Sequence, residues 1–163
     1  MTSIILPKIA PGITTRWQRF DELSAPALYE LLRFRQQIFV VEQRSPYPDL
    51  DGLDQRAAHL LLRNGGDLAG CLRVVPAAGQ IRIGRVAVAI DWRRQGLGRR
   101  LMAEALGFCR DRYPGQEISL SAQLPLAPFY ESLGFTGTSA PYDDFGVPHV
   151  EMSMRRFASD EPS

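Results

Sequence analysis

The sequence predicts a single α/β domain of mixed character, and two periodic patterns favour this class. From Glu117 to Gln123 apolar and polar residues alternate strictly, as in a half-buried strand. From Leu97 to Cys109 an apolar or small residue recurs at every fourth position, as on one face of a helix. A chain of 163 residues suits one hydrophobic core. We expect the domain to cover residues 14–157, between a loose N-terminal arm (1–13) and a disordered tail (158–163).

Composition narrows the class of protein further. With 45% hydrophobic residues, 23% charged residues and a net charge of +1, the chain has a globular composition and lacks the basic surplus of nucleic-acid binders. Its two cysteines, Cys71 and Cys109, fall in apolar patterns, so we expect buried free thiols and no metal site. No apolar run is long enough to cross a membrane, and the N-terminus lacks the basic region of a signal peptide. These features predict a cytoplasmic protein with no membrane partner.

The N-terminal part predicts a strand, a helix and a long loop. The strand runs from Thr14 to Phe20, and Ser24 is suited to cap a helix that extends to about Phe39 with Pro26 in its first turn. Arg35 interrupts the apolar face of this helix. Residues 40–55 are rich in Pro, Asp and Gly and predict an ordered loop. The apolar face carries Leu28, Leu31, Leu32, Ile38 and Phe39.

A hairpin and an irregular strand follow. Strands over His59–Arg63 and Leu68–Val75 flank an Asn-Gly-Gly-Asp turn, which is typical of a β-hairpin. In the next strand Ile81 and Ile83 share one parity, whereas Val86, Val88 and Ile90 share the other. Either a β-bulge at Gly84 and Arg85 inserts a residue, or the strand is central and buried on both faces.

A glycine turn separates this strand from the helix that begins at Leu97. The order strand, glycine turn, helix directs free backbone N–H groups and the positive end of the helix dipole toward the turn. Glycines let an anionic group approach the backbone closely. Arg93, Arg94, Arg99 and Arg100 add positive charge. We therefore predict that a phosphorylated ligand binds here.

The C-terminal third completes the sheet. Pro114-Gly115 ends the long helix. The strand from Glu117 to Gln123 is expected to run parallel to the preceding strand, because a helix joins the two. A short helix over Leu126–Leu133 follows. Phe135–Thr138 and Val150–Phe157 then predict a closing β-hairpin across a loop of Pro, Asp and Gly.

These segments resemble the Gcn5-related N-acetyltransferase superfamily. The turn Arg93-Arg94-Gln95-Gly96-Leu97-Gly98 fits its Q/R-x-x-G-x-G/A signature, and Phe129-Tyr130-Glu131-Ser132-Leu133-Gly134-Phe135 resembles its FYxxxGF signature. Leu32–Asp54 and Tyr142–Met152 are similar to the ElaA-like subgroup. The resemblance covers nearly the whole chain. It implies a mixed, mostly antiparallel sheet, with a parallel strand pair splayed around an acyl-CoA site and helices on both faces.

The resemblance also implies a reaction and a cosubstrate. The protein would be an N-acetyltransferase that transfers the acetyl group of acetyl-CoA to a primary amine, on a small molecule or a peptide, by direct attack in a ternary complex. The oligomeric state, including a homodimer through the closing hairpin, is left open. Coenzyme A would contact the strand residues Val86, Ala87 and Val88, the turn residues Arg93, Arg94, Gln95, Gly96, Leu97, Gly98 and Arg99, and Gln123, which stands where the superfamily often has asparagine.

Two proton transfers need side chains. Tyr130 occupies the position of the superfamily's tyrosine, and we expect it to protonate the departing thiolate. A free N–H of the splayed strand would stabilise the oxyanion, by about 3 kcal/mol for one such donor. For the general base, Glu42 is the candidate, and the alternatives are a structural ion pair between Glu42 and Arg35 or proton transfer to water. His59 and His149 are interpreted as structural.

The acidic residues of the loop lead to a separate hypothesis. Their spacing does not fit an EF-hand calcium loop. We interpret them as an acidic rim that attracts a cationic amine. The rim would comprise Asp49, Asp51 and Asp54 with Asp143 and Asp144.

Competing functions are weighed on the same residues. A Rossmann dinucleotide site fails because Leu101 stands in place of the third glycine. The phosphate-loop signature is missing from the sequence. The serious alternative is an acyl-CoA-binding or interaction module without catalysis, and thiol release from acetyl-CoA in the presence of amines separates the two.

Overall fold

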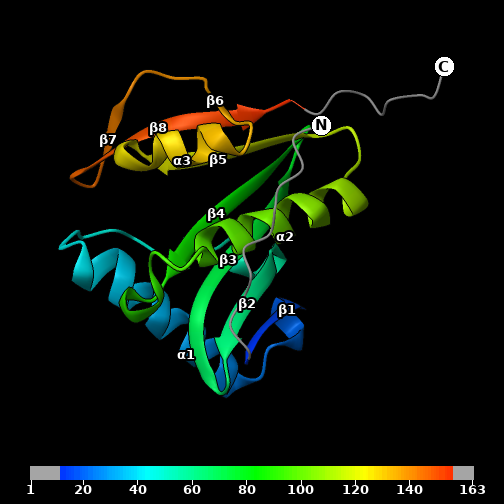
Figure 1. The fold of residues 1–163 in the computed structure, drawn as a ribbon, viewed down its shortest axis with the longest axis vertical. Coiled ribbons are helices and arrows are strands. Elements are labelled where there is room, and N and C mark those ends of the chain that lie inside the picture. The colour runs from blue at the N-terminus through cyan, green and yellow to red at the C-terminus, as the bar shows by residue number, and fades with distance from the viewer. Residues whose placement is uncertain (1–11, 156–163) are drawn as a thin grey trace.

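One sheet organises the part of the chain that the computed structural model describes, residues 12–155. Its strands lie in the order β1-β2-β3-β4-β5-β8-β6, and β7 pairs with β8 (Figure 1). Within these residues the β4–β5 pair is parallel and the other pairs are antiparallel. The strands are β1 (Ile13–Arg19), β2 (Ala58–Asn64), β3 (Asp67–Ala77), β4 (Gln80–Val88), β5 (Glu117–Gln123), β6 (Thr136–Gly137), β7 (Tyr142–Asp144) and β8 (Val147–Met154). The helices are α1 (Ala25–Gln36), α2 (Leu97–Arg112) and α3 (Ala127–Ser132).

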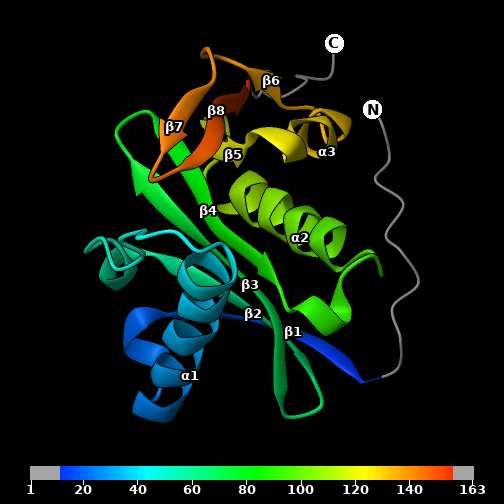
Figure 2. The same ribbon diagram turned by 90° about the vertical axis from the view of Figure 1, so that its left-hand side faces the viewer.

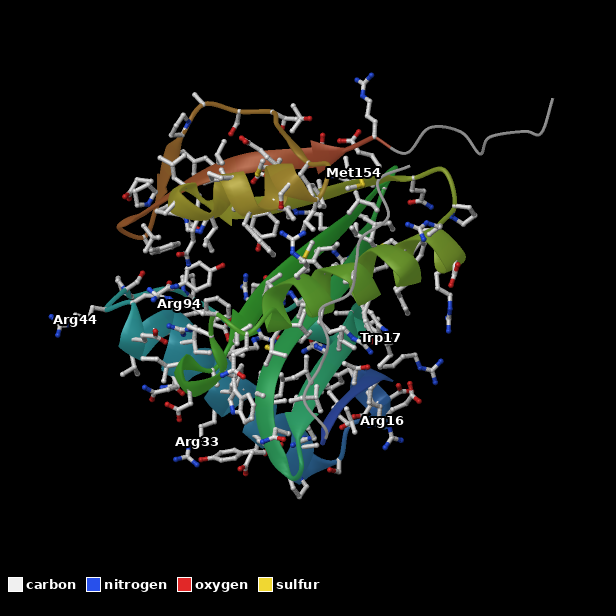
Figure 3. All side chains as sticks on the ribbon, in the orientation of Figure 1. Arg16, Trp17, Arg33, Arg44, Arg94 and Met154 are labelled. Carbon is white, nitrogen blue, oxygen red and sulfur yellow. The ribbon has the colours of Figure 1, made fainter. Side chains whose placement is uncertain are left out.

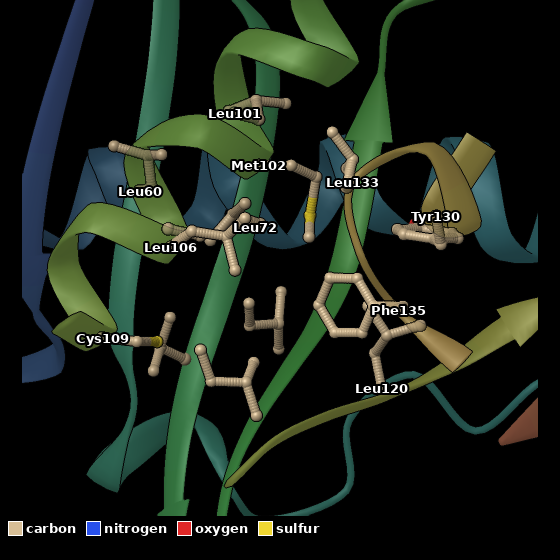
Figure 4. Close-up of a cluster of buried hydrophobic side chains, with 14 of the residues drawn as sticks. Leu60, Leu72, Leu101, Met102, Leu106, Cys109, Leu120, Tyr130, Leu133 and Phe135 are labelled. Carbon is tan, nitrogen blue, oxygen red and sulfur yellow. The ribbon is translucent and has the colours of Figure 1, made fainter. Parts of the chain in front are cut away.

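Helices cover both faces of the sheet, and they divide the core in two. Figures 1 and 2 show α1 on one face of β2–β4 and α2 on the other. Because side chains alternate along a strand, Leu60 and Leu62 of β2 pack in the α2 layer, whereas Leu61 packs in the α1 layer. The α2 layer continues under α3, where Figure 4 shows Met102 together with Phe135. This arrangement confirms the predicted fold class.

The N-terminal α-helix ends at Gln36, slightly before the predicted end near Phe39, but helical structure of another kind continues to Glu42. The side-chain oxygen of Ser24 accepts a hydrogen bond from the Ala27 N–H at 3.2 Å, which confirms the predicted cap. After α1 the chain continues through a π-helical turn, Gln37–Glu42, before it enters the loop. Arg35 is 1% exposed and lies on the buried face of α1. The residue that interrupts the apolar pattern is therefore part of the interior.

The predicted glycine turn and long helix are confirmed. Gly96 precedes α2 with a φ of +80°, the left-handed conformation that glycine adopts without strain. The predicted apolar stripe of the helix is fully buried, and the helix ends before Pro114. This stripe comprises Leu97, Leu101, Ala105 and Cys109.

A β-bulge in β4 explains the change of parity in that strand. Cys71 pairs with Ala87 and Arg73 pairs with Gly84, so β4 contains one residue more than β3 between these two pairs. Arg85, at the bulge, has a φ of +54°. The extra residue places Val86 and Val88 in the same α2 layer as Ile81 and Ile83, which confirms the bulge. Ile90, the third member of the second parity set, lies beyond β4 and is exposed. The residues brought to one face are Ile81, Ile83, Val86 and Val88.

The C-terminal hairpin differs from the prediction. The expected loop before Val150 contains the short strand β7, and β8 begins three residues early, at Val147. The tight turn between them is formed by Phe145 and Gly146, both with positive φ. Sequence patterning missed β7 because three residues are too few to show a period of two.

Two further expectations concern the chain ends and membranes. The predicted arm and tail lie mostly outside the described residues, and Ile13 belongs to β1. Among residues 12–155, none of the helices is long and apolar enough to cross a membrane.

Candidate functional site

A cleft of about 400 Å³ lies where β4 and β5 separate. The two strands pair only from Gln80 to Arg82 and from Glu117 to Ser119, although both extend further. Figure 1 shows them together at one end and apart at the other. The part of β4 that contains the bulge therefore presents backbone N–H and C=O groups to the cleft instead of to β5.

The cleft is lined from both faces of the sheet. Leu120 and Tyr130 lie in the α2 layer of the core. Ser121, Gln123 and His149 have the opposite parity and line the cleft from the face that carries the loop after α1. Two ligands can thus approach each other through the gap, one from each face.

The side chain of Arg85 ties the bulge to this loop. Its guanidinium donates hydrogen bonds to the Tyr47 hydroxyl at 2.6 Å and to the Asp49 carbonyl at 2.9 Å, and it lies 4.9 Å above the Tyr47 ring. It also pairs with the carboxylates of Asp49 and Asp51, at 2.7 and 3.2 Å. A left-handed conformation at a residue with a Cβ costs of order 1–3 kcal/mol, and these contacts offset that cost. Sequence reasoning missed this role, because the partners lie 34 to 38 residues away.

The loop acids are paired with arginines in one network, in which Asp49 and Asp54 are buried whereas Asp51 is more exposed and lines the cleft. Arg35 binds Asp54 at 2.7 Å and Asp49 at 3.0 Å. Arg73 binds Asp54 at 3.0 Å and also pairs with Asp51. With Arg85, three arginines balance three aspartates, so the network carries no net charge. The hypothesis that these three acids attract an amine is wrong.

Hydrogen bonds within this network oppose the effect of burial. Burial alone would raise the pKa of the Asp54 carboxyl, but the hydrogen bonds and charges of Arg35 and Arg73 outweigh it and lower that pKa. The pKa of Asp51 is lowered in the same way by Arg73 and by the Leu53 N–H, again against the effect of burial. Both carboxyls are therefore ionised near neutral pH.

Two cleft residues keep charges that the network does not neutralise. Asp144 of β7 is half-buried in the lining, and its carboxylate has no hydrogen bond or ion pair within residues 12–155. The guanidinium of Arg56, which also lines the cleft, has no hydrogen bond or ion pair within the same residues. Asp143, by contrast, points its carboxylate at the Gly146 N–H, 3.1 Å away, and stabilises the hairpin turn. The acidic rim is thus reduced to Asp144.

The glycine turn has the geometry of an anion site. Residues at the start of α2, from Leu97 to Arg99, have backbone N–H groups without carbonyl partners earlier in the helix. Arg94 has a φ of +62°, and neither it nor Arg99 pairs with a carboxylate within the described residues. Arg99 lies 5.7 Å from the Phe129 ring and donates to the Ser132 hydroxyl at 3.2 Å. Arg100, the fourth arginine of the predicted cluster, pairs with Glu104 at 3.0 Å.

Glu42 pairs with Arg93 and not with Arg35. Arg93 also donates to the Val88 carbonyl at 2.9 Å, so this ion pair connects the end of the π-helical turn with the end of β4. Hydrogen bonding by Arg93 lowers the pKa of the Glu42 carboxyl despite some burial. The carboxylate does not line the cleft. The structure therefore does not bring Glu42 to the place where a general base would act.

Tyr130 lies at the inner end of the cleft. Tyr130 is 6% exposed, and its ring makes edge contacts with Phe129 and Phe135, at centroid distances of 5.1 and 6.1 Å. Figure 4 shows Tyr130 and Phe135 in the same core cluster. Gly134 turns the chain back with a φ of +104°, and the Phe135 N–H donates to the Tyr130 carbonyl at 3.1 Å. Burial raises the pKa of the Tyr130 phenol to about 12, so it holds its proton at neutral pH.

The remaining predicted contacts are brought to the same region. Val86 and Gln123 line the cleft from its two strands, and Ala87 and Val88 continue β4 toward the glycine turn. His149, interpreted from sequence as structural, also lines the cleft, whereas His59 is buried against the Asp54 carbonyl. A signal in the sequence was available, because Val150 and Met152 share one parity of the strand and His149 has the other. This alternation indicates that His149 faces away from the core that buries Val150 and Met152.

Comparison with known proteins shows similarity over most of the chain. The family model described as an acetyltransferase (GNAT) domain matches residues 33–156. ElaA of Escherichia coli is 35% identical over 144 residues, which span 84% of this chain and 94% of ElaA. A UPF0039 protein of Schizosaccharomyces pombe is 39% identical over 141 residues, which span 85% of this chain and 94% of that protein.

Solved structures agree with the sequence comparison. The crystal structure of Escherichia coli ElaA superposes with a TM-score of 0.84 at 34% identity and covers 88% of this chain and 99% of that one. An acyl-CoA N-acyltransferase from Pseudomonas aeruginosa superposes with a TM-score of 0.82, also at 34% identity, and covers 87% of this chain and 99% of that one.

Proposed function

This chain belongs to the GNAT acetyltransferase family, in its ElaA-like subgroup, and on that premise we propose that it transfers the acetyl group of acetyl-CoA to a primary amine. The observation that carries the proposal is the cleft that passes through the sheet where β4 and β5 separate. It lets a thioester and an amine enter from opposite faces and react in one complex. Positioning two reactants in this way supplies much of the acceleration in such transfers.

The acyl-CoA half of the site follows β4 and α2. We assign the pyrophosphate to the N–H groups at the start of α2. The guanidinium groups of Arg94 and Arg99, which pair with no carboxylate among the described residues, would add positive charge there. Pantetheine would pair with the backbone of Val86–Val88, on the edge of β4 that β5 leaves open. Gln123, across the gap, offers an amide to the same ligand. Glu42 is assigned to holding Arg93 at this end of β4.

The reaction needs a donor for the oxyanion and an acid for the thiolate. A backbone N–H of the bulge residues that line the cleft is assigned to the oxyanion, and removal of one donor of this kind costs about 3–4 kcal/mol in other acyl transfers. Tyr130 is assigned to the protonation of the thiolate. Burial raises the pKa of Tyr130 to about 12, so the phenol carries the proton that the departing thiolate needs.

The test combines binding with turnover. Calorimetric titration with acetyl-CoA, with ATP and NAD as controls, measures the site, and thiol release measures turnover with spermidine, kanamycin, lysine and a short peptide as amines. We expect acetyl-CoA to bind selectively. Tyr130→Phe should lower kcat by about 10²-fold or more while the Kd for acetyl-CoA is unchanged. Tyr29→Phe, at a side chain 71% exposed on α1, is the matched control.

The same experiment tests the alternative function. Selective acetyl-CoA binding without thiol release from any amine would favour a non-catalytic acyl-CoA-binding module. Equal binding of acetyl-CoA, ATP and NAD would contradict the assignment of the glycine turn, and both functions would be abandoned.

A further inference from the structure

We infer that His149 is the general base of the transfer, and that the acceptor amine binds between His149 and Asp144. The inference rests on the proposed function and adds to it the residues that handle the amine. It begins from the position of the hairpin β7–β8, which sequence patterning did not predict. Four residues on one face of this hairpin line the cleft, namely Tyr142, Asp144, Val147 and His149.

The hydrogen bond of the imidazole determines which nitrogen is available. Nδ1 of His149 lies 2.8 Å from the carbonyl oxygen of Val147. A carbonyl oxygen accepts hydrogen bonds only, so Nδ1 carries the proton of the neutral ring. Nε2 then has the lone pair, and within residues 12–155 it has no hydrogen-bond partner. The ring is held by the chain in the tautomer that a base requires.

The neighbours of His149 stabilise the ring without occupying Nε2. The Tyr142 ring stacks on the imidazole, with 6.1 Å between the ring centroids and an interplanar angle of 29°. The Tyr142 hydroxyl is already bonded to Ser121 and to Glu151, the latter at 3.0 Å. His149 is paired with Gln123 in the β5–β8 register. This pair lies at the end of β5 where β5 has separated from β4.

Asp144 supplies the charge that an ammonium group needs. In the register of β7 and β8, Asp144 is opposite Val147 and thus diagonal to His149. Diagonal neighbours on one face lie roughly 7–8 Å apart, which leaves room for an amine between them. Asp49, Asp51 and Asp54 are neutralised by arginines, whereas the Asp144 carboxylate has no hydrogen bond or ion pair among the described residues.

The base and the acid then lie on opposite faces of the sheet. Tyr130 reaches the gap from the α2 layer and His149 from the loop face. The ammonium gives one proton to Nε2, the amine nitrogen forms the C–N bond, and the C–S bond breaks as the Tyr130 hydroxyl protonates the sulfur. The amide nitrogen loses its second proton and Tyr130 regains one, so one proton is released to solvent from His149 in each turnover.

Substitution of His149 tests the inference with the full chain. His149→Asn keeps a donor near the Nδ1 position and removes Nε2, and we expect kcat to fall by about 10²-fold or more with an unchanged Kd for acetyl-CoA. In His149→Ala, added imidazole should restore part of the rate. A merely structural role would not give this rescue. Asp144→Asn should mainly raise the KM for the amine, and Asp143→Asn, outside the cleft, should change neither constant.

The outcomes separate this inference from the function on which it rests. His149→Asn with wild-type kcat, or His149→Ala inactive and not rescued by imidazole, would overturn the role of His149. An unchanged amine KM in Asp144→Asn would overturn the binding position of the amine. If the wild-type protein released no thiol with any of the four amines, the proposed function itself would fall, and this inference with it.

Discussion

Replacement of Arg35 by methionine should destabilise the protein more than any surface change on the same helix. Methionine fills much of the space of the arginine stem and preserves its apolar packing. It removes the hydrogen bonds from Arg35 to both oxygens of Asp54, at 2.7 and 3.2 Å, and to Asp49 at 3.0 Å. The network of three arginines and three aspartates then carries one uncompensated negative charge in the interior.

The expected loss follows from what the two acids retain. Asp49 remains 2.7 Å from Arg85, and Asp54 remains 3.0 Å from Arg73. Breaking a buried ion pair costs about 3–5 kcal/mol when it leaves a charge unpaired. Because both acids keep one partner, we expect the lower end, about 3 kcal/mol. Domains of this size are typically stable by about 5–15 kcal/mol, so the variant should still fold.

Urea denaturation followed by circular dichroism measures this loss. We expect a lower midpoint with an unchanged slope, since the surface exposed on unfolding is the same. Arg33→Met is the matched control, because Arg33 on the same helix points to solvent (Figure 3), and it should change the free energy of unfolding by less than about 0.5 kcal/mol. Adding Asp54→Asn to Arg35→Met restores neutrality and should recover part of the loss. A loss below about 1 kcal/mol, or a further loss in the double variant, would refute the argument.

Three other predictions follow from the same structure. Because the pKa values of Asp51 and Asp54 are lowered in the folded state, their stabilisation is present above the unfolded pKa of about 4 and is lost as the pH falls below it. An acid titration of the unfolding free energy should therefore show a smaller loss for Asp51→Asn than for the wild type. Gly96→Ala places a Cβ at a φ of +80° and should lower the free energy of unfolding in urea by about 1–2 kcal/mol. Gly98→Ala should leave that free energy unchanged, because the added Cβ would lie 3.9 Å from the Phe129 side chain, an ordinary van der Waals contact. Equal effects of the two alanines would contradict this. Burial raises the pKa of the Cys71 thiol to about 12, so iodoacetamide at pH 8 should not label this thiol until the protein unfolds. Mass spectrometry measures the labelling. If the native protein were labelled at the rate of a free thiol, the burial of Cys71 would be contradicted.

The sequence determined the elements whose information is local. The cap at Ser24, the period of α2 and the glycine turn depend on residues within a few positions of each other, and all three are found as predicted. Even the bulge of β4 was encoded locally, as a change of parity around Gly84. One family signature, Arg93–Gly98, lies in the glycine turn, and the order of these local elements is why the fold class could be predicted.

Only the tertiary structure decided how the charged groups are paired. Arg35 pairs with Asp49 and Asp54, which are 14 and 19 residues away in the sequence. Arg85 pairs with Asp51 at a separation of 34 residues, and Arg93 pairs with Glu42 at a separation of 51. The partner of a charge depends on which chain segments meet in space, and periodicity along the chain carries no such information. The prediction that the loop acids form an unneutralised acidic rim was therefore wrong. For the same reason the cleft-lining groups of β7 and β8 could be identified only from the structure, in which this hairpin lies beside the opening between β4 and β5.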